Sequence, residues 1–363
     1  MIKLTQGNML EADVEALVNT VNCVGIMGKG IALQFKQAFR DNFHAYANAC
    51  RKGEVKPGRM FIFPTNRMFN PKYIINFPTK RHWKEKSKLE YIERGLNALV
   101  PEVRRLGIKA IAIPPLGCGY GGLKWPEVRN LIETAFDQLP DVQALLFEPR
   151  GTPEADSMPI DPRKPALTRA RALFIKLLEQ YAIPGYRLSL LEIQKLAYFL
   201  QVAGEPLRLQ YIKQKYGPYA ENLHFVLQRL EGHYIRGYGD RSIKASIRLL
   251  TSASEEADTF LADDPEAFQR LERVRKLIEG FETPYGMELL SSVHWVAAAD
   301  DEPAQTLEHA VERIFAWNAH KKKTFKATHV HKAWQRLVEQ QSLAASCRTE
   351  LVTSCPIAVE KLF

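Results

Sequence analysis

The sequence predicts two domains, an α/β domain followed by a mainly α-helical one. The chain has 363 residues, which is long for a single hydrophobic core. Over the first 150 residues short β-rich runs alternate with amphipathic helical patterns, whereas the pattern after residue 165 is helical. The stretch between them has five prolines in seventeen positions. We therefore predict a first domain at 1–148, a Pro-rich linker at 149–165 and a helical domain at 166–363.

Six apolar runs predict the strands of the first domain, and three amphipathic stretches predict its helices. The strands are expected at 2–7, 14–22, 60–64, 73–78, 108–114 and 142–149, and the helices at about 30–46, 88–106 and 126–138. This alternation is typical of a mixed, mostly parallel sheet with helices on both faces, a three-layer α/β/α arrangement. Ligands of such sheets bind at the C-terminal ends of the strands.

The second half reads as helices with one short interruption. Apolar residues recur at helical spacing over 170–182, 189–204 and 219–232, where Gly232 is a candidate helix terminator. Residues 242–250 alternate briefly and predict a small wing or hairpin. No paired acids or metal-ligand spacing suggest chemistry in this half.

The charge of +9 is unevenly distributed along the chain. Residues 1–150 hold 22 Lys and Arg against 14 Asp and Glu, whereas residues 254–312 hold 15 acids against 4 bases. The first half is therefore suited to a polyanionic partner, and part of the second half resembles a polyanion itself.

Cysteine usage and hydropathy limit the possible compartments. The five cysteines are scattered without CxxC spacing, which favours a reducing cytoplasm over a disulfide framework or a zinc site. No apolar run reaches the ~20 residues of a membrane span, and the N-terminus does not read as a signal peptide. We expect a cytoplasmic protein without a metal or other cofactor.

Two glycine-bearing segments follow predicted strands. Gly25, Gly28 and Gly30 precede a predicted helix, and four more glycines lie within residues 117–122. Glycines let a backbone approach a ligand closely, and free amides at a helix N-terminus suit a phosphate, so two such loops favour a diphosphate ligand. Neither segment matches the P-loop pattern, and tight turns alone remain the alternative interpretation.

A basic segment follows the strand predicted at 73–78. It places six basic side chains around Trp83, namely Lys80, Arg81, His82, Lys84, Lys86 and Lys88. A solvated loop would explain the charge alone. The pattern also suits a nucleic acid, because lysine and arginine attract phosphates and an indole ring can stack on an unpaired base.

These blocks together resemble the macrodomain, an ADP-ribose-binding fold. The resemblance covers roughly residues 1–148 and rests on "TQGNMLEADVEALVNTVNCVGIMGKGIALQFK", "YIINFPTKRHW" and "PPLGCGYGGLKW". It is greatest to the branch of hydrolases with a lysine at a strand end, where Lys80 stands, and within it to DNA ADP-ribosyl glycohydrolase (DarG) antitoxins. Their partner is an ADP-ribosyltransferase toxin of the DarT type, which modifies thymine in single-stranded DNA.

The resemblance implies roles for individual residues. Lys80 and Asn22 are implied as catalytic, Asn22 lying beside the distal ribose. Asn8 stands where many macrodomains have an aspartate that touches the adenine amine. The implied ADP-ribose-binding residues are Asn8, Met9, Asn22, Gly28, Lys29, Gly30, Ile31, Leu116, Gly117, Cys118, Gly119, Tyr120, Gly121 and Gly122, and the implied DNA-binding residues are Arg81, His82, Trp83, Lys84 and Lys86. Protein-directed relatives carry an acid where this chain has Gly121.

The residues themselves are compatible with a glycohydrolase. Enzymes that break glycosidic bonds usually employ two carboxylates, and none is found in the loops expected to form the pocket. A lysine can instead protonate or polarise the leaving base, or attack the anomeric carbon as an amine. The sequence leaves both roles of Lys80 open. Like-charge repulsion from Arg81, Lys84 and Lys86 is expected to lower the pKa of Lys80.

The second half resembles, more weakly, the helical antitoxin domain called Panacea or SocA-like. The likeness rests on "QKLAYF" and "KYGPYAENL" and implies that this domain neutralises a cognate toxin. Its carboxylates could imitate phosphates in the toxin's nucleic-acid groove, form a solvated acidic face, or dock on the basic first domain. The candidates are Glu255, Glu256, Asp258, Asp263, Asp264, Asp300, Asp301 and Glu302.

The leading hypothesis is an antitoxin enzyme that removes ADP-ribose from thymine in single-stranded DNA and binds its toxin through the C-terminal domain. A hydrolase acting on ADP-ribosylated protein and a non-catalytic ADP-ribose reader are the alternatives. A nucleic-acid-binding regulator would need a basic recognition face in the second half, which carries a net charge of only +1.

Overall fold

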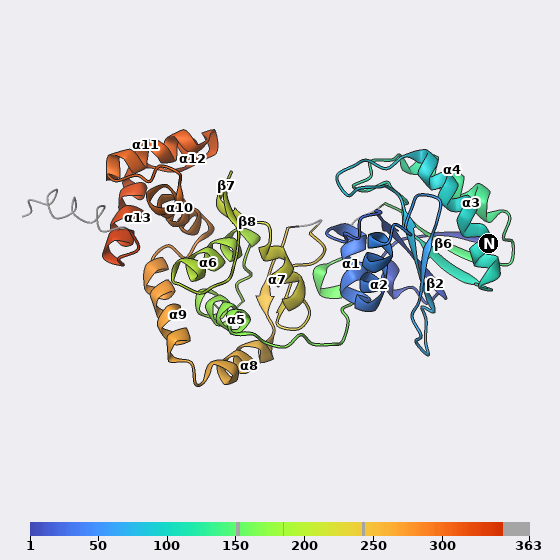
Figure 1. Ribbon diagram of the computed structural model, residues 1–363, viewed down its shortest axis with the longest axis horizontal. Helices are drawn as coiled ribbons and strands as arrows, with labels where there is room; N and C mark the ends of the chain where they lie inside the picture. The colour runs from blue at the N-terminus through green and yellow to red at the C-terminus, as the bar shows by residue number, and fades with distance from the viewer. Residues whose placement is uncertain (150–152, 184, 242–243, 344–363) are drawn as a thin grey trace, which may run out of the picture. The chain divides into compact units, whose positions relative to one another are not determined.

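The computed structural model describes residues 1–149, 153–183, 185–241 and 244–343 (Figure 1). They form two compact units. The first contains Met1–Lys164 together with Gly239–Ile243, and the second contains Pro165–Tyr238 and the chain from Lys244 onward.

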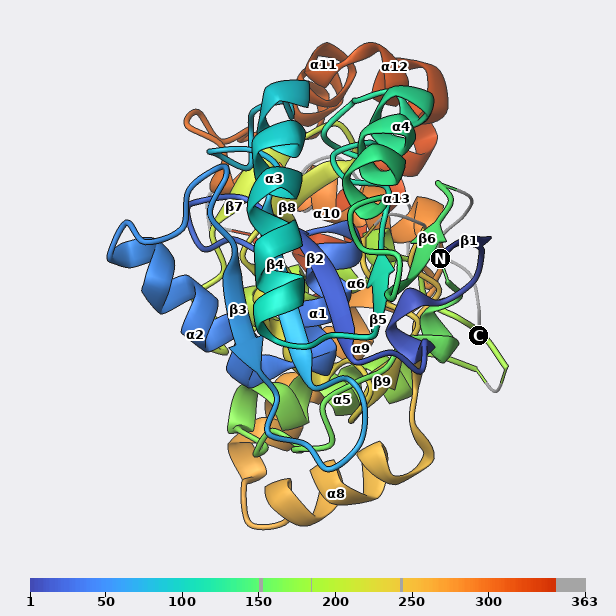
Figure 2. The same ribbon diagram turned by 90° about the vertical axis from the view of Figure 1, so that its right-hand side faces the viewer.

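The first unit is built on a six-stranded sheet with the order β1-β6-β5-β2-β4-β3 (Figure 2). All neighbours pair in parallel except β3, which runs antiparallel to β4 at one edge. This confirms the predicted mixed, mostly parallel sheet. The strands are β1 (Ile2–Thr5), β2 (Ala16–Val21), β3 (Phe61–Pro64), β4 (Tyr73–Pro78), β5 (Ala110–Ile113) and β6 (Gln143–Phe147).

Helices cover both faces of the sheet, as predicted (Figure 1). They are α1 (Gly30–Ala38), α2 (Arg40–Arg51), α3 (Leu89–Arg105) and α4 (Trp125–Phe136). The helix predicted at 30–46 is two helices that meet at Phe39, where the backbone leaves helical geometry with φ −134° and ψ 71°. Phe39 is buried, so core packing breaks the helix without a proline or glycine to mark the position.

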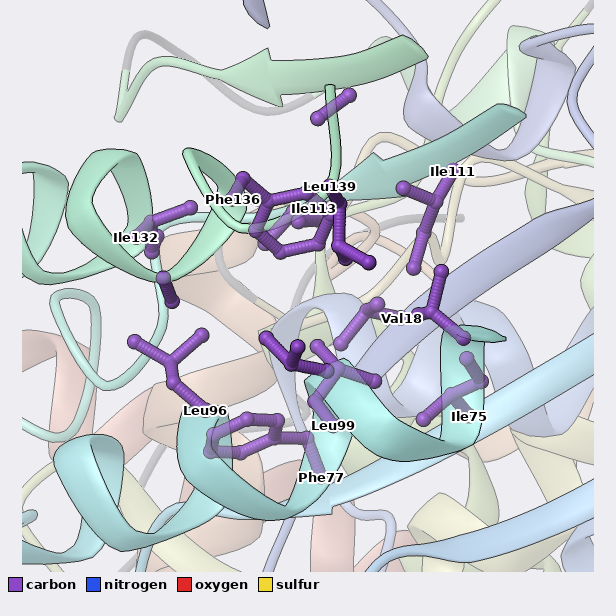
Figure 3. Packing of buried hydrophobic residues seen from close by; sticks show 14 of the residues in the cluster. Val18, Ile75, Phe77, Leu96, Leu99, Ile111, Ile113, Ile132, Phe136 and Leu139 are labelled. Carbon is purple, nitrogen blue, oxygen red and sulfur yellow. The ribbon is translucent and has the colours of Figure 1, made fainter. Parts of the chain in front are cut away.

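The alternation of side chains along β2 divides the core into two layers. Ala16 and Val18 pack under α3 and α4, whereas Leu17 packs on the opposite side with Phe35 of α1. Figure 3 shows the larger layer, in which Val18 lies among side chains of the neighbouring strands and helices. Fully burying an aliphatic or aromatic side chain of this size contributes ~1.5–3 kcal/mol.

Most of the segment predicted as a linker packs on the first unit. Ala155 lies in a short 3-10 helix, η2 (Ala155–Ser157), and both Ala155 and Met158 are buried. The buried Asp161 carboxylate forms an ion pair with Arg163, which lowers the pKa of Asp161 to about 2. Residues 153–164 therefore belong to the first unit, although the proline content of residues 149–165 suggested a spacer.

The second unit is mainly helical, as predicted. Its helices are α5 (Arg169–Tyr181), α6 (Leu190–Val202), α7 (Leu223–Leu230), α8 (Thr251–Leu261), α9 (Pro265–Ile278), α10 (Pro284–His294), η3 (Trp295–Ala299), α11 (Leu307–Trp317), α12 (Ala319–Thr324) and α13 (Ala327–Glu339). Strands β7 (Tyr211–Gln214) and β8 (Gly217–Ala220) form a hairpin. Strands β9 (Ile235–Arg236) and β10 (Arg248–Leu249) also pair, and β10 falls in the predicted wing, of which residues 242 and 243 lie outside the described residues.

The two sequence motifs of the second half lie against each other. The Gln194 amide donates to the Ala220 carbonyl and accepts from the Ala220 N–H, both at 3.0 Å. Lys195 donates to the Pro218 carbonyl at 2.6 Å. The side chains of "QKLAYF" thus hold strand β8 of "KYGPYAENL" as a neighbouring strand would, which gives both motifs a structural role.

A glycine in α3 gives a test of this packing. Alanine in place of glycine ordinarily stabilises a helix by about 0.5–1 kcal/mol. At Gly95, however, an added Cβ would lie 2.1 Å from Cζ of the buried Phe77 ring. We expect Gly95→Ala to lower the stability of the first unit by about 1–3 kcal/mol, because overpacking outweighs the helical gain. Hydrogen exchange of peptides from α3 and β4 measures this in the full chain.

The matched control is the double variant Gly95→Ala/Phe77→Leu. Leucine lacks the far end of the ring, so the second substitution should restore part of the protection lost in the first. A single variant with slower exchange than the wild type would contradict the packing shown here.

Candidate functional site

Three loops meet at the C-terminal ends of the adjacent strands β5, β2 and β4. We call residues 22–30 the first glycine loop, residues 79–88 the basic segment and residues 116–124 the second glycine loop. The Cys23 N–H donates to the Arg81 carbonyl at 2.9 Å, which joins the first loop to the basic segment. The Lys29 ammonium lies 4.9 Å from the centre of the Tyr120 ring, which joins the two glycine loops. Apart from Asn8 and Met9, which follow β1, the sequence-predicted site residues therefore lie in or beside these three loops, at one edge of the sheet.

Asn22 shapes the first glycine loop from within. Its side chain is buried, donates to the Ile26 carbonyl at 2.6 Å, and accepts from the N–H groups of Val24 and Ile26. The Tyr46 hydroxyl donates to the Asn22 main-chain carbonyl at 2.7 Å. Asn22 thus holds the loop in place, which is a positioning role in addition to the ligand contact predicted for it.

Helix α1 begins at the end of this loop, as the sequence predicts, but one of its first amides is engaged. Gly30 has φ +57°, and its N–H donates to the Asp240 carbonyl at 2.9 Å within the first unit. The Gln34 amide donates to the Asp240 carboxylate at 2.7 Å. A phosphate that used the Gly30 amide would have to displace the Asp240 carbonyl, a partner more than 200 residues away that the sequence did not reveal.

The second glycine loop is tightly packed at Gly117 and Gly121, although a Cβ added to Gly119 would meet nothing within 4 Å. Leu116 is fully buried in the core, and a Cβ added to Gly121 would lie 2.2 Å from the Gly117 carbonyl oxygen. No side chain fits at Gly121 in this backbone, which gives a physical reason for the acid absent from that position. Burial raises the pKa of the Cys118 thiol to about 11, so Cys118 is a packed side chain and not an activated nucleophile.

Lys80 leaves the end of β4 and reaches the second glycine loop. Its ammonium donates to the Glu85 carbonyl at 3.1 Å and to the Tyr120 carbonyl at 3.5 Å. Burial lowers the pKa of Lys80, the Lys86 charge lowers that pKa further, and Glu85 opposes them. The direction is as predicted, but the main cause is burial and not the charges of Arg81 and Lys84.

Glu85 corrects the expectation that the pocket loops contain no acid. It lies within the basic segment, and its charge acts on Lys80. The five cations around Glu85 in the sequence obscure this single acid.

The basic segment presents an exposed aromatic side chain. Trp83 is 51% exposed, so it is not packed beneath the loop. Its ring centre lies 5.5 Å from that of His82 and 5.1 Å from the Lys84 ammonium. Arg81 and Lys88 instead lie over the Tyr91 ring, at 5.9 and 5.6 Å. The segment therefore offers a flat surface flanked by cations.

Comparison with known proteins connects this geometry to a family. The macro domain family model matches residues 18–132. The "DNA ADP-ribosyl glycohydrolase" of Thermus aquaticus is 49% identical over 343 residues, which is 94% of either chain. The chain belongs to the DNA ADP-ribosyl glycohydrolase family.

A "DNA ADP-ribosyl transferase-DNA ADP-ribosyl glycohydrolase fusion protein" of Thermosipho africanus is 34% identical over 146 residues, 36% of this chain and 38% of that one. The solved "Macrodomain of Mycobacterium tuberculosis DarG" is 54% identical and covers 41% of this chain and 99% of its own, with a TM-score of 0.41.

Membership of the glycohydrolase family makes this chain a hydrolase of the macrodomain type.

Asn8 caps the short 3-10 helix η1 (Met9–Glu11), where its amide donates to Glu11 and to the Ser157 carbonyl. Met9 is buried in the core, so only its backbone is available to a ligand. The contacts of both residues with the adenine end remain predictions.

The described residues contain neither a metal-ligand cluster nor a membrane-spanning helix. No group of three or more His, Cys, Asp or Glu side chains comes together as a metal site requires. In the same part of the chain, every helix is too short or too polar to cross a bilayer.

The electrostatic coupling within the basic segment is testable. Since Lys86 lowers the pKa of Lys80, we expect Lys86→Gln to raise the pKa of Lys80 toward its ordinary value. The measurement is a pH titration of the Lys80 side-chain signal by NMR in protein labelled at lysine carbon atoms, with Lys80→Ala identifying that signal. Lys84→Gln is the matched control, because Lys84 is not among the causes of the Lys80 shift. Equal shifts in both variants would mean that the general charge of the segment, and not Lys86, is responsible.

Proposed function

We propose that the first unit hydrolyses the N-glycosidic bond between ADP-ribose and a thymine of single-stranded DNA, with Lys80 as the catalytic group. The observation that carries this proposal is the position of Lys80, whose ammonium lies between two main-chain carbonyls at the junction of the three loops. Membership of the glycohydrolase family supports the reaction class.

The two glycine loops bind the diphosphate and leave the distal ribose near Lys80. The bond from the anomeric carbon to the base breaks with oxocarbenium-like charge on the sugar and negative charge on the departing thymine. The Lys80 ammonium stabilises that negative charge and gives the base its proton. A water molecule adds to the anomeric carbon and loses a proton, so the products are free ADP-ribose and unmodified DNA. Attack by the neutral Lys80 amine is the other route, and it predicts the opposite pH dependence.

The basic segment supports single-stranded DNA as the substrate. A single strand exposes its bases, and the exposed Trp83 ring can stack on one with a contribution of ~1–3 kcal/mol. Lys84 and Lys86 lie close enough to meet the flanking phosphates, and each such contact adds to the salt dependence of binding. Neither feature is needed to bind ADP-ribose alone.

The second unit is proposed to bind and neutralise a cognate ADP-ribosyltransferase toxin. A relative in which the transferase and the glycohydrolase share one chain supports this pairing of activities. Ion pairs within the unit separate the acidic residues that were candidates for phosphate mimicry into two groups. Asp258 pairs with Lys176, Asp264 with Arg169, and Asp300 and Glu302 with Arg313, so these four carboxylates already have cationic partners within the unit. Glu255, Asp263 and Asp301 remain as exposed candidates for phosphate mimicry, with no ion pair among the described residues.

A cytoplasmic location completes the proposal. The cysteines at positions 23, 50 and 118 are free thiols, as expected in a reducing compartment.

The catalytic role of Lys80 is tested with a single-stranded oligonucleotide that carries ADP-ribose on one thymine. We expect Lys80→Ala to lose at least about a hundredfold in turnover, since a general acid contributes ~10²–10⁴-fold. ADP-ribose should still bind, because the glycine loops are unchanged. If the ammonium is the active form, wild-type turnover falls as pH rises through the lowered pKa of Lys80. If the amine attacks, turnover rises over the same range.

Two substrates separate the alternatives. Release of ADP-ribose from the oligonucleotide but not from an ADP-ribosylated protein supports the DNA reaction, and the reverse supports the protein-directed one. Binding of ADP-ribose without turnover of either substrate would mean a reader module. Glu93→Lys, an exposed change on α3, controls for altered surface charge.

Toxin binding through the second unit is tested by charge reversal. We expect the triple variant Glu255→Lys/Asp263→Lys/Asp301→Lys to weaken binding of the purified toxin at least about tenfold, with a smaller dependence on salt. Calorimetry at two salt concentrations measures both effects, and the same Glu93→Lys variant is the control. Unchanged affinity would exclude these carboxylates from the interface.

A further inference from the structure

The space where a side chain of Gly121 would lie is filled by Ser87. A Cβ built on Gly121 would be 2.3 Å from the Ser87 hydroxyl oxygen and 2.8 Å from its Cβ. Ser87 also crowds Gly117, where an added Cβ would lie 3.0 Å from the Ser87 Cβ. The end of the basic segment is thus wedged beneath the second glycine loop.

Ser87 is placed there by its backbone and not by its hydroxyl. Its N–H donates to the Gly121 carbonyl at 3.0 Å, and the residue is 7% exposed. The hydroxyl oxygen is buried and has no hydrogen-bond partner among the described residues. A buried hydroxyl without a partner is unfavourable for folding, so stability alone does not account for a serine at this position.

The wedge lies between the two groups that hold Lys80. Tyr120, whose carbonyl accepts from Lys80, directly precedes Gly121. Glu85, whose carbonyl is the other acceptor, stands two residues before Ser87. Lys86 lies next to the same loop, with its ammonium 3.4 Å from a Cβ added to Gly122. A shift of Ser87 relative to Gly121 would therefore change the distance between the two carbonyls.

We propose that Ser87 is a positioning residue of the glycohydrolase, which wedges beneath Gly121 and so holds the Tyr120 carbonyl against the Lys80 ammonium. The inference rests on the catalytic role proposed for Lys80 and adds the element that fixes its geometry. Two neutral carbonyls then orient the ammonium where a carboxylate would otherwise be needed. Since misplacing a catalytic group by about 1 Å can cost a hundredfold in rate, the wedge is expected to affect turnover more than ligand binding.

The test compares Ser87→Gly with Ser87→Cys in the full chain. Glycine removes the wedge, whereas cysteine preserves its volume. With the wedge removed the loop relaxes, Lys80 becomes better hydrated, and its pKa rises toward the ordinary value, because burial is the main cause of its lowering. We expect Ser87→Gly to lose about tenfold or more in turnover of the modified oligonucleotide, with less than about threefold loss in ADP-ribose affinity. Ser87→Cys should retain most of the turnover and the wild-type titration of Lys80.

Gly95→Ala controls for a mere loss of stability, since it strains helix α3, which begins two residues after Ser87, without touching the second glycine loop. It should leave the NMR titration of Lys80 unchanged. The proposal is overturned if Ser87→Gly leaves both titration and turnover unchanged, or if Gly95→Ala and Ser87→Gly shift the titration equally. The titration does not depend on catalysis. Normal turnover by Lys80→Ala would therefore refute the catalytic assignment, while a shifted titration in Ser87→Gly would still support the wedge.

Discussion

The parallel pairing of β2 with β4 on one side and β5 on the other is the constraint on which the first unit depends. It brings three loops to one edge of the sheet, and each contact that Lys80 makes comes from one of them. A buried amide pair fixes the register. Asn19 and Asn76 are opposite each other, and the Asn19 amide donates to Asn76 at 3.0 Å. A slip of one residue would lose that bond and exchange side chains between the two differently packed core layers, so the register is strongly specified.

The environment of Lys80 suits a group that must carry charge and release a proton. Burial makes the ammonium less stable than in water, and two carbonyl acceptors keep it ordered without neutralising it. A carboxylate partner would raise the pKa of the lysine and make it a poorer acid. The absence of a side chain at Gly121 is therefore consistent with acid catalysis by lysine alone. In that chemistry the departing pyrimidine needs one proton, which the ammonium supplies without a carboxylate.

The parts of the fold that follow from local patterns were predictable from the sequence. The six strands were found because β-branched runs between turn residues identify buried strands, and Lys80 was found because it ends one of them. The break between α1 and α2 at Phe39 was not predictable from the sequence, since it depends on core packing and has no local signal. The role of Asp240 at the first glycine loop was not predictable, because its contact with Gly30 spans some 200 residues of sequence. The role proposed for Ser87 was not predictable either, because it depends on the contacts of Ser87 with the second glycine loop. A single serine in a basic loop forms no recognisable sequence pattern.

The second unit shows how a sequence motif can mark a structural contact and not a functional site. The side chains of Gln194 and Lys195 in "QKLAYF" form hydrogen bonds to the backbone of β8. Four of the eight acidic candidates likewise form ion pairs with cations of the same unit. Phosphate mimicry requires carboxylates that keep their charge and face solvent, because a paired carboxylate attracts a basic groove only weakly. The toxin binding that we propose for this unit therefore depends on surface residues outside the two motifs, and the helical scaffold that the motifs stabilise would present them.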